Sequence, residues 1–216
     1  MDLTSGKVEF LEVDNLAALK SVVIKPDQNL YIQFESTQDS LEPIFLKITQ
    51  SQDSSLTLVC IFKHSIQFNL DLNINGDNTV SKIFNLVDLV KDSKVELTQK
   101  ITTEFESNHA EHATIIVLNN NSSASVSHIA KANSTTKNLK LKQKIQALLL
   151  SPKTRVQMKP ILQIESQDVS CRHGSTQGLL DLNAIFYLQS RGLNFETCKQ
   201  LLINVFKAEI LDMIKL

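Results

Sequence analysis

Apolar and polar residues alternate along most of this chain, beginning at about Val22. A period of two predicts β-strands that bury one face and expose the other. Pro160 lies within the last alternating segment and cannot donate a ladder hydrogen bond, so its strand is predicted to lie at an edge, a bulge or a corner. The alternating segments are 66–74, 95–105, 139–149 and 156–164, with a shorter, more apolar strand at 115–118.

Many strands without intervening helices are typical of a sandwich, a barrel or a β-solenoid. The sequence shows no exact repeat period that would select the solenoid, so all three architectures stay open on pattern alone. The chain has only five glycines. We therefore expect Asn, Asp, Ser and Thr to form most of the turns through local side-chain hydrogen bonds.

The C-terminal segment changes to a spacing of three and four residues, which predicts helices. Asp181 is suited to cap a helix over 182–191, and Gly192 to the left-handed position that follows it. Asn194 is suited to cap a second helix that runs to about Lys215. The apolar stripe of this second helix is wide, and it predicts packing on the β core, an apolar surface for a partner, or both.

Composition narrows the functional class. The 216 residues carry 22 Lys and Arg against 23 Asp and Glu, so nothing indicates binding to nucleic acid or to an anionic membrane. Three widely spaced cysteines fit a reducing compartment better than a disulfide framework. No apolar run approaches the roughly 20 residues that span a bilayer, and the N-terminus does not have the pattern of a signal peptide. We expect a cytoplasmic protein.

The segment 168–178 joins the β part to the helical part and holds the strongest candidate site. Cys171 and His173 stand two positions apart, so in a strand they project from the same face. Thiolate and imidazole both suit iron, yet two ligands make an incomplete site, and the others would come from a partner chain or from inorganic sulfide. The structural alternatives are a small buried cysteine and a histidine that stabilises the bend. Gly174 and Gly178 are interpreted as the points where the strand gives way to the helices.

The other histidines and cysteines are assigned structural roles. His109 and His112 would share a face only in a helix, so in this β context they are predicted to be turn residues. His128 has the parity of its apolar neighbours and is predicted to be a satisfied interior or interface histidine. Cys60 and Cys198 are predicted to be core residues.

The charged residues indicate no further chemistry. Lys140, Lys142 and Lys144 share one parity and predict a solvated face of the β part. Glu165 is predicted to be an exposed strand carboxylate. The sequence has no Gly-x-x-x-x-Gly-Lys-Ser/Thr phosphate loop, so the chain is not expected to bind ATP itself.

A series of ordered motifs covers 147–211, close to a third of the chain. In these motifs the chain resembles the SufB/SufD family of iron–sulfur cluster assembly proteins, and its His-Gly-Ser-Thr-Gln-Gly run favours the SufD type. The motifs are Leu-Leu-Leu-Ser at 148–151, Pro-Ile-Leu-Gln-Ile-Glu at 160–165, Asp-Val-Ser-Cys-Arg-His-Gly-Ser-Thr-Gln-Gly at 168–178, Phe-Tyr-Leu-Gln-Ser-Arg-Gly-Leu at 186–193, Leu-Leu-Ile-Asn-Val-Phe at 201–206 and Ala-Glu-Ile-Leu at 208–211.

The resemblance implies a right-handed parallel β-helix over 1–180, followed by a C-terminal helical hairpin over 181–216. It implies a scaffold subunit, not an enzyme, in a complex of the SufBCD type. The hairpin would dock a SufC-like ATPase, and the β-helix would pair with a SufB-like subunit or with a second copy of this chain. His173, with Cys171, would bind a transient iron–sulfur cluster at that interface. The chain looks like a short form of the family.

Two other interpretations stay open on the residues alone. One is a structural β-solenoid interaction protein without a metal role. The other is a carbohydrate-active enzyme built on a β-helix. That enzyme would need clustered carboxylates or an Arg/Lys pair on adjacent turns, and the alternating pattern shows no such cluster.

Overall fold

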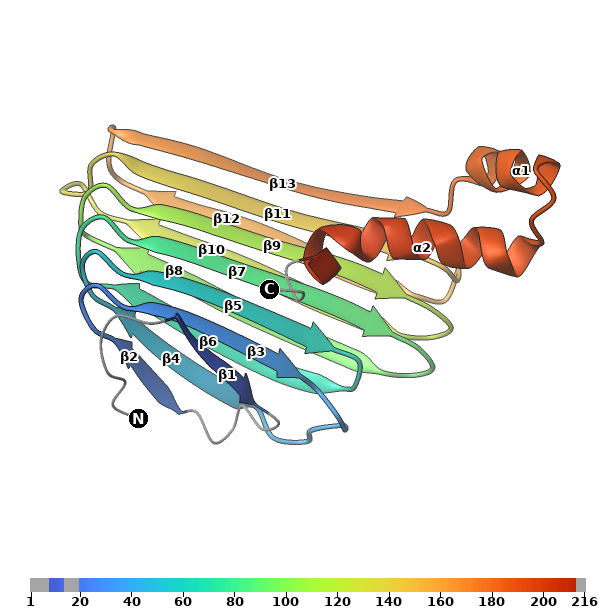
Figure 1. Cartoon of the computed structure of the whole chain (residues 1–216), viewed down its shortest axis with the longest axis horizontal. Coiled ribbons are helices and arrows are strands. Elements are labelled where there is room, and N and C mark those ends of the chain that lie inside the picture. The colour runs from blue at the N-terminus through green and yellow to red at the C-terminus, as the bar shows by residue number, and fades with distance from the viewer. Residues whose placement is uncertain (1–7, 14–19, 213–216) are drawn as a thin grey trace.

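The computed structural model of the chain describes residues 8–13 and 20–212, with side chains from residue 20 onward. In this part, successive strands alternate between two sheets, and every pair of neighbouring strands is parallel (Figure 1). Sheet A contains, in order, β1 (Val8–Val13), β3 (Asn29–Glu35), β5 (Ser55–Phe62), β7 (Val80–Leu89), β9 (His109–Leu118), β11 (Leu139–Leu149) and β13 (Val169–Leu179). Sheet B contains β2 (Ser21–Ile24), β4 (Ile44–Gln50), β6 (Ile66–Ile74), β8 (Lys94–Thr103), β10 (Ser123–Ala132) and β12 (Arg155–Ile164).

This topology is a β-solenoid in which two strands make one turn, so the predicted fold class is confirmed. The turns lengthen along the chain, since strands grow from 7 residues in β3 to 11 in β11. Asn29 pairs with Ser55, 26 residues later, whereas Ser123 pairs with Arg155, 32 residues later. A changing turn length explains why the sequence shows no exact repeat. The strand β1 lies upstream of the predicted start of the alternation.

The core lies between the two sheets, where inward side chains of successive turns stack in columns. Neighbouring strands are parallel and in register, so paired residues point to the same face of the sheet. An inward residue of one turn therefore lies directly above an inward residue of the turn before it. Phe62 packs on Phe34 and Phe68, with ring centroids 6.0 and 5.6 Å apart. Apolar columns of this kind drive the stacking of turns, because each turn alone would leave its inward face exposed.

Corners between strands use left-handed backbone at residues other than glycine, as the low glycine content predicted. Asp27, Asp53, Asn78, Ser107 and Asn138 have φ values between 47° and 59° at successive corners that lead from sheet B to sheet A. Asn and Asp tolerate this conformation because their short polar side chains bond locally. One such bond joins adjacent corners, where the Asn78 amide donates to Asp53 at 3.2 Å.

The two predicted helices are present as α1 (Leu182–Ser190) and α2 (Phe195–Leu211). The Asp181 carboxylate accepts from the backbone N–H of Asn183 at 2.9 Å, and Gly192 has a φ of 91° after the last turn of α1. The Asn194 side chain caps α2 by accepting from the N–H of Thr197 at 2.9 Å. The predicted end of the second helix at Lys215 lies outside the described residues.

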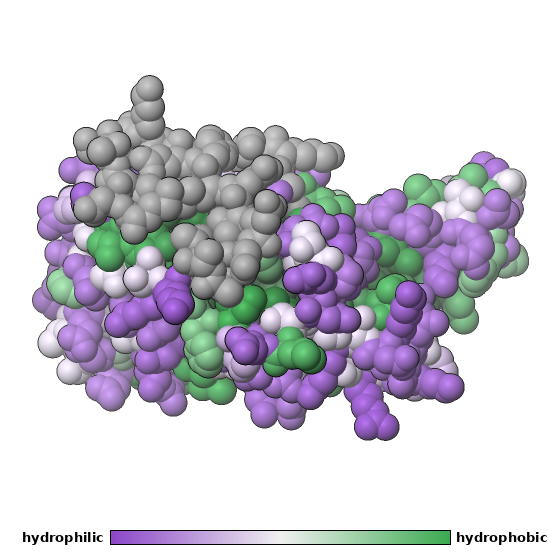
Figure 2. Space-filling view, turned by 90° about the horizontal axis from the view of Figure 1, so that it is seen from below, coloured by the Kyte–Doolittle hydropathy of each residue, from purple (hydrophilic) through white to green (hydrophobic). Residues whose placement is uncertain are grey.

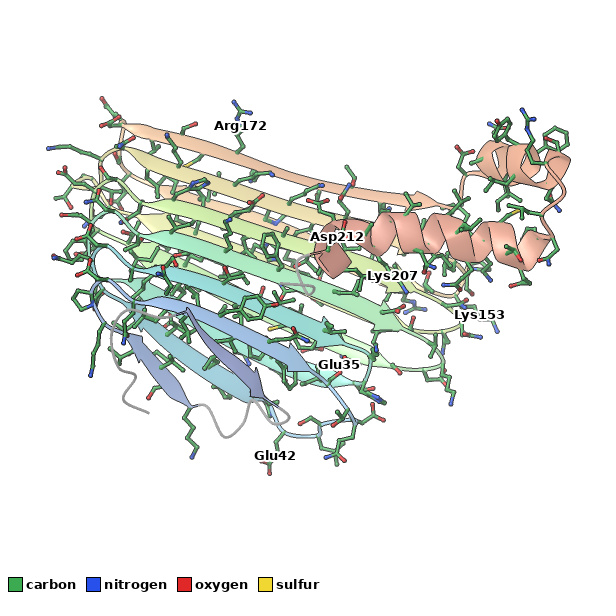
Figure 3. All side chains as sticks on the ribbon, viewed as in Figure 1. Glu35, Glu42, Lys153, Arg172, Lys207 and Asp212 are labelled. Carbon is green, nitrogen blue, oxygen red and sulfur yellow. The ribbon has the colours of Figure 1, made fainter. Side chains whose placement is uncertain are left out.

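Helix α2 lies along the outer face of sheet A, whereas α1 projects beyond the ends of the strands (Figure 1). Ile210 packs on β7 and β9, and Ile203 packs nearer the strand ends. Lys207 forms an ion pair with Asp88 of β7, and Lys144 of β11 pairs with Glu209 at 2.6 Å. In Figure 3, Lys207 lies on the side of α2 that faces the strands. Apolar contact and partly buried charge pairing together hold α2 on the sheet.

Candidate functional site

Complete burial stops at the last turn of the solenoid. Strands β10 and β11 bury every second residue, but β12 and β13 contain no fully buried residue. Both strands are the last of their sheets, so each leaves one edge without a strand partner in the described part of the chain. Pro160 lies on β12, which confirms the predicted edge position. The residues that pack on the core from this open end, but stay partly exposed, are Val156, Met158, Leu162, Ile164, Val169 and Cys171.

Cys171 and His173 lie on β13 at this open end. They pair in register with the inward residues Leu141 and Gln143 of β11, so both are placed on the inward parity of the strand. Two positions along a strand separate their Cα atoms by about 6.6 Å. Cys171 is half-buried against the core, while His173 is exposed. Arg172, between them, extends away from the solenoid in Figure 3.

The environment treats the two candidate ligands differently. Burial raises the pKa of the Cys171 thiol, so the thiolate forms less readily there than in water. The exposed His173 is accessible without any movement of the core. Among the described residues, no three His, Cys, Asp or Glu side chains gather where they could hold a metal ion. The described residues therefore offer two candidate ligands here, Cys171 and His173, on one face of β13, and the shared face is what the sequence predicted.

Gly174 and Gly178 do not end the strand, contrary to the sequence interpretation. Both lie within β13, which continues to Leu179. A Cβ atom added at either glycine would meet nothing within 4 Å. Packing among the described residues therefore requires neither glycine, and both leave the outward face of an edge strand open to close approach by another backbone.

Beneath this open end lies a buried polar cluster that the sequence analysis missed. It consists of Asn85, Gln99, His112, Thr114 and His128, all on inward positions between the sheets. His109 and His112 both lie on β9, so their assignment to a turn is wrong. His128 is interior, as predicted. Its ring stacks on that of His112 with centroids 3.4 Å apart. Alternation along each strand placed these polar residues inward with the apolar ones, and the turn-to-turn register decided that they meet one another.

The hydrogen bonds of the cluster determine which ring nitrogen of His112 carries the proton. Gln99 and Asn85 form a reciprocal amide pair, with N–O distances of 2.8 and 2.9 Å. The Gln99 carbonyl oxygen also lies 2.5 Å from His112 Nε2. A carbonyl oxygen can only accept, so Nε2 carries the proton. His128 Nε2 lies 2.8 Å from the hydroxyl of Thr114.

Both buried histidines are neutral at physiological pH. Burial lowers the pKa of His112 to about 3. Burial, and then the nearby His112, lower the pKa of His128 well below its ordinary value. With Nε2 protonated, neutral His112 presents a lone pair at Nδ1, and this atom has no hydrogen-bond partner. The Nδ1 atom of His128 also has none, so this histidine is satisfied through one nitrogen only.

The helices carry a second candidate surface. Leu182 and Phe186 of α1 are 72% and 73% exposed and stand four residues apart, so they share one face of the helix. Val205 of α2 is also 72% exposed. Figure 2 shows apolar side chains between polar ones on the protruding helical end. A hollow of about 320 Å³ lies between β13 and α2, and its lining includes Leu179 and Phe206. The helical part therefore both packs on the core and exposes apolar surface.

The other cysteines and the charged residues of the sequence analysis lie in the core or on the solvent-exposed surface. Cys60 and Cys198 are fully buried, which confirms their core assignment. Lys142 bonds to Glu111 at 2.7 Å, and this bond raises the pKa of the lysine. Glu165 is exposed just after β12.

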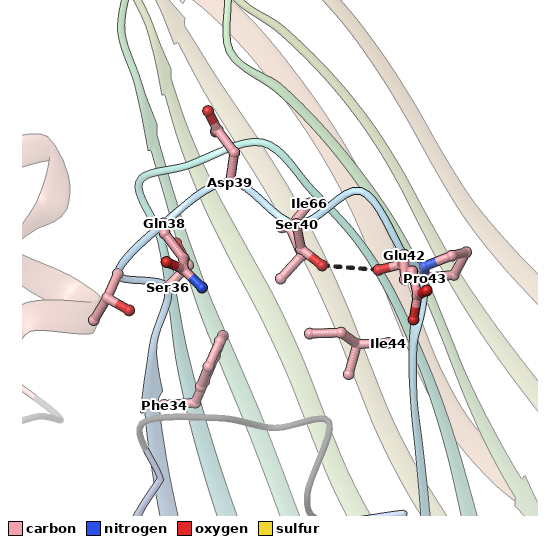
Figure 4. Close-up of a pocket in the computed structure, with 10 residues that line it drawn as sticks. Phe34, Ser36, Gln38, Asp39, Ser40, Glu42, Pro43, Ile44 and Ile66 are labelled. Carbon is pink, nitrogen blue, oxygen red and sulfur yellow. Dashed lines mark hydrogen bonds between the residues drawn. The ribbon is translucent and has the colours of Figure 1, made fainter.

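Another hollow of about 320 Å³ lies in the connection between β3 and β4, at the opposite end of the solenoid (Figure 4). Its carboxylates come from Asp39 and Glu42. The Asp39 carboxylate accepts from the backbone N–H of Ser65 at 2.6 Å, which lowers its pKa. Asp39 thus tethers the loop, and the hollow has no His or Cys in its lining. No helix in the described ranges is long and apolar enough to cross a membrane.

The fold and the open end define a class: a β-solenoid with an unpaired last turn that carries Cys and His, followed by a helical hairpin with exposed apolar residues. The sequence matches the family described as "SUF system FeS cluster assembly, SufBD core domain" over residues 30–206. The chain belongs to this family. The match begins at residue 30, far upstream of the motifs at 147–211.

Individual relatives match a shorter part of the chain. An iron–sulfur cluster assembly SufBD family protein of Synechocystis is 49% identical over 69 residues, which are 32% of this chain and 15% of the relative. SufD of Escherichia coli is 41% identical over 68 residues, or 32% and 16% of the two chains. SufD of Bacillus subtilis is 30% identical over 96 residues, or 44% and 22%. The chain thus spans less than a quarter of each relative in these alignments.

Proposed function

We propose that this protein is a non-enzymatic scaffold subunit of the SufD type, on which an iron–sulfur cluster is assembled at a contact with a partner chain. The observation that carries the proposal is the open last turn, where Cys171 and His173 share the inward parity of an edge strand. Membership of the SufBD core family and similarity to two proteins named SufD support the same role.

The cluster is cargo in this proposal, and the chain supplies part of its ligands. His173 is exposed and would supply an imidazole nitrogen to iron. Cys171 would bind as thiolate, with iron displacing to solvent the proton that burial otherwise retains on the thiol. Sulfide and residues of the partner complete the coordination. The partner is a SufB-like subunit or a second copy of this chain, docked on the free edges of β12 and β13.

The helical hairpin is the proposed docking surface for a SufC-like ATPase. Leu182 and Phe186 present two large apolar side chains on one face of α1, and the hollow beside Phe206 can receive an apolar side chain of the partner. Burial of both residues in a complex would remove apolar area from water, and large aromatic anchors contribute most to such contacts. ATP would be bound by the partner, not by this chain.

Anaerobic reconstitution with iron and sulfide tests the metal role. We expect His173→Ala to lower cluster formation in the assembled complex, and Cys171→Ala to lower it to a smaller extent. His109→Ala is the matched control, because His109 is an exposed histidine of the same sheet on the outward parity. Unchanged cluster formation in His173→Ala would favour the structural solenoid without a metal role.

Co-purification with a SufC-like ATPase tests the docking surface. Phe186→Asp should abolish or strongly weaken binding. Phe45→Asp, which alters a residue of β4 that is 64% exposed at the other end of the solenoid, should leave binding unchanged. Equal effects of the two substitutions, or no ATPase binding by the intact chain, would contradict docking through the helices.

A further inference from the structure

Gln143 stands between the buried polar cluster and the open end. It lies on β11, in register with His112 of β9 on one side and with His173 of β13 on the other. The residue is only 2% exposed, and neither its side-chain nitrogen nor its oxygen has a hydrogen-bond partner. A buried amide without partners costs about 1–3 kcal/mol in stability, so its place in the core calls for an explanation.

The cluster imposes a direction on any hydrogen bond that Gln143 makes with it. His112 donates through Nε2 to Gln99 and presents an unpartnered lone pair at Nδ1. Only the NH2 group of Gln143 can donate to that lone pair. When the NH2 group donates to His112, the carbonyl oxygen of Gln143 is free to accept a hydrogen bond from the side of β13. The group on β13 that bonds to it must therefore be a donor, such as an N–H.

We propose that Gln143 is a positioning residue that holds the His173 imidazole in one tautomer and orientation for iron. Its NH2 group donates to His112, and its carbonyl oxygen accepts the N–H of His173 that faces the core. The second ring nitrogen of His173 is then unprotonated, and its lone pair is directed to the open end. Histidines that bind metals generally donate their other N–H to an oxygen in this way, which fixes the ring and raises its basicity.

The role in iron binding rests on the proposed function, but the hydrogen-bond chain does not. It is formed within one protein chain, from Gln99 through His112 and Gln143 to His173, and it exists or fails without any metal. Its last two links form by rotation of the Gln143 side chain about its own bonds, since the backbone register already places His112 and His173 on either side.

The test is 15N NMR of the histidine rings in the full metal-free chain, which distinguishes the protonated from the unprotonated nitrogen. We expect His112 protonated at Nε2 and His173 in one dominant tautomer. Gln143→Met keeps the length of the side chain and removes both polar atoms. It should move His173 to a mixture of its two tautomers, because the oxygen that accepts one of its N–H groups is lost.

Gln146→Met is the matched control, on the same strand but on the outward parity, and it should leave the His173 signals unchanged. In the reconstituted complex, Gln143→Met should weaken iron retention by about 10–100-fold, the loss usual for removing the partner of a metal-binding histidine. Identical His173 tautomers in the parent chain and in Gln143→Met would overturn the proposal, as would a proton on Nδ1 of His112. If the His173 tautomers do not change in Gln143→Met but His173→Ala loses iron, the positioning role fails and the proposed scaffold function stands. A tautomer shift without any effect of His173→Ala on iron would reject the metal role but keep the positioning role.

Discussion

Acidification from pH 7.5 to pH 5.0 is expected to destabilise the solenoid through its buried histidine pair. An imidazole has an ordinary pKa of 6.5, whereas burial lowers the pKa of His112 to about 3 in the folded chain. Between these values the unfolded chain binds a proton that the folded chain does not. The free energy of unfolding therefore falls as the pH drops below 6.5 and is unaffected by this group above that pH.

The magnitude follows from the two pKa values. At pH 5.0, about 1.5 units below the ordinary pKa, His112 alone lowers the free energy of unfolding by about 2 kcal/mol. His128 has its pKa lowered in the same direction and adds to the loss. Against the 5–15 kcal/mol typical of single domains, an effect of this size is easily measured.

The perturbation is His112→Phe, which keeps an aromatic ring beside His128 but cannot titrate. At pH 7.5 it should cost about 1 kcal/mol, because the hydrogen bond to Gln99 is lost. Between pH 7.5 and 5.0, however, it should lose about 2 kcal/mol less than the parent chain. Urea unfolding followed by far-UV circular dichroism at each pH measures the difference.

The control is a substitution that destabilises the chain but leaves both buried histidines in place. Ile116→Val removes one methyl group from a fully buried residue of the same strand and should cost about 0.5–1.5 kcal/mol at both pH values. An equal loss of stability in His112→Phe and in the parent chain on acidification would refute a role of buried His112 in the pH dependence. The carboxylates titrate equally in all three proteins and cancel in the comparison.

Three further substitutions probe the corners and the helix. Gly76→Ala should lower stability by about 1–3 kcal/mol, because its Cβ would stand 2.1 Å from the backbone nitrogen of Gln52; an unchanged melting temperature would contradict this close approach. Lys91→Gly should raise stability by about 0.5–1 kcal/mol, since Lys91 has a φ of 61°, and a loss in urea unfolding would speak against strain there. Asp88→Ala leaves the largely buried Lys207 without its ion-pair partner, so amide hydrogen exchange should accelerate in α2 and not in β5. Uniform exchange across both elements would argue that the ion pair does not hold the helix locally.

The strands, the two helices and their caps follow from local chemistry and could be predicted from the residues. Period-two alternation reports one buried face at every strand, and it needs no knowledge of which strands are neighbours. Asp181 and Asn194 cap their helices because a side chain of that length reaches the first free N–H groups. The proximity of Cys171 and His173 is equally local, since two positions on one strand share a face.

The tertiary structure decided which residues of neighbouring turns each side chain contacts. His112 and His128 are 16 positions apart in number and belong to different sheets, yet their rings stack. Gln143 comes beside both His112 and His173 only because turns of about 30 residues stack in parallel register. The turn length drifts along the chain, so no repeat in the sequence exposes that register. Local pattern therefore determined which face each side chain occupies, and the stacking of turns determined what it meets there.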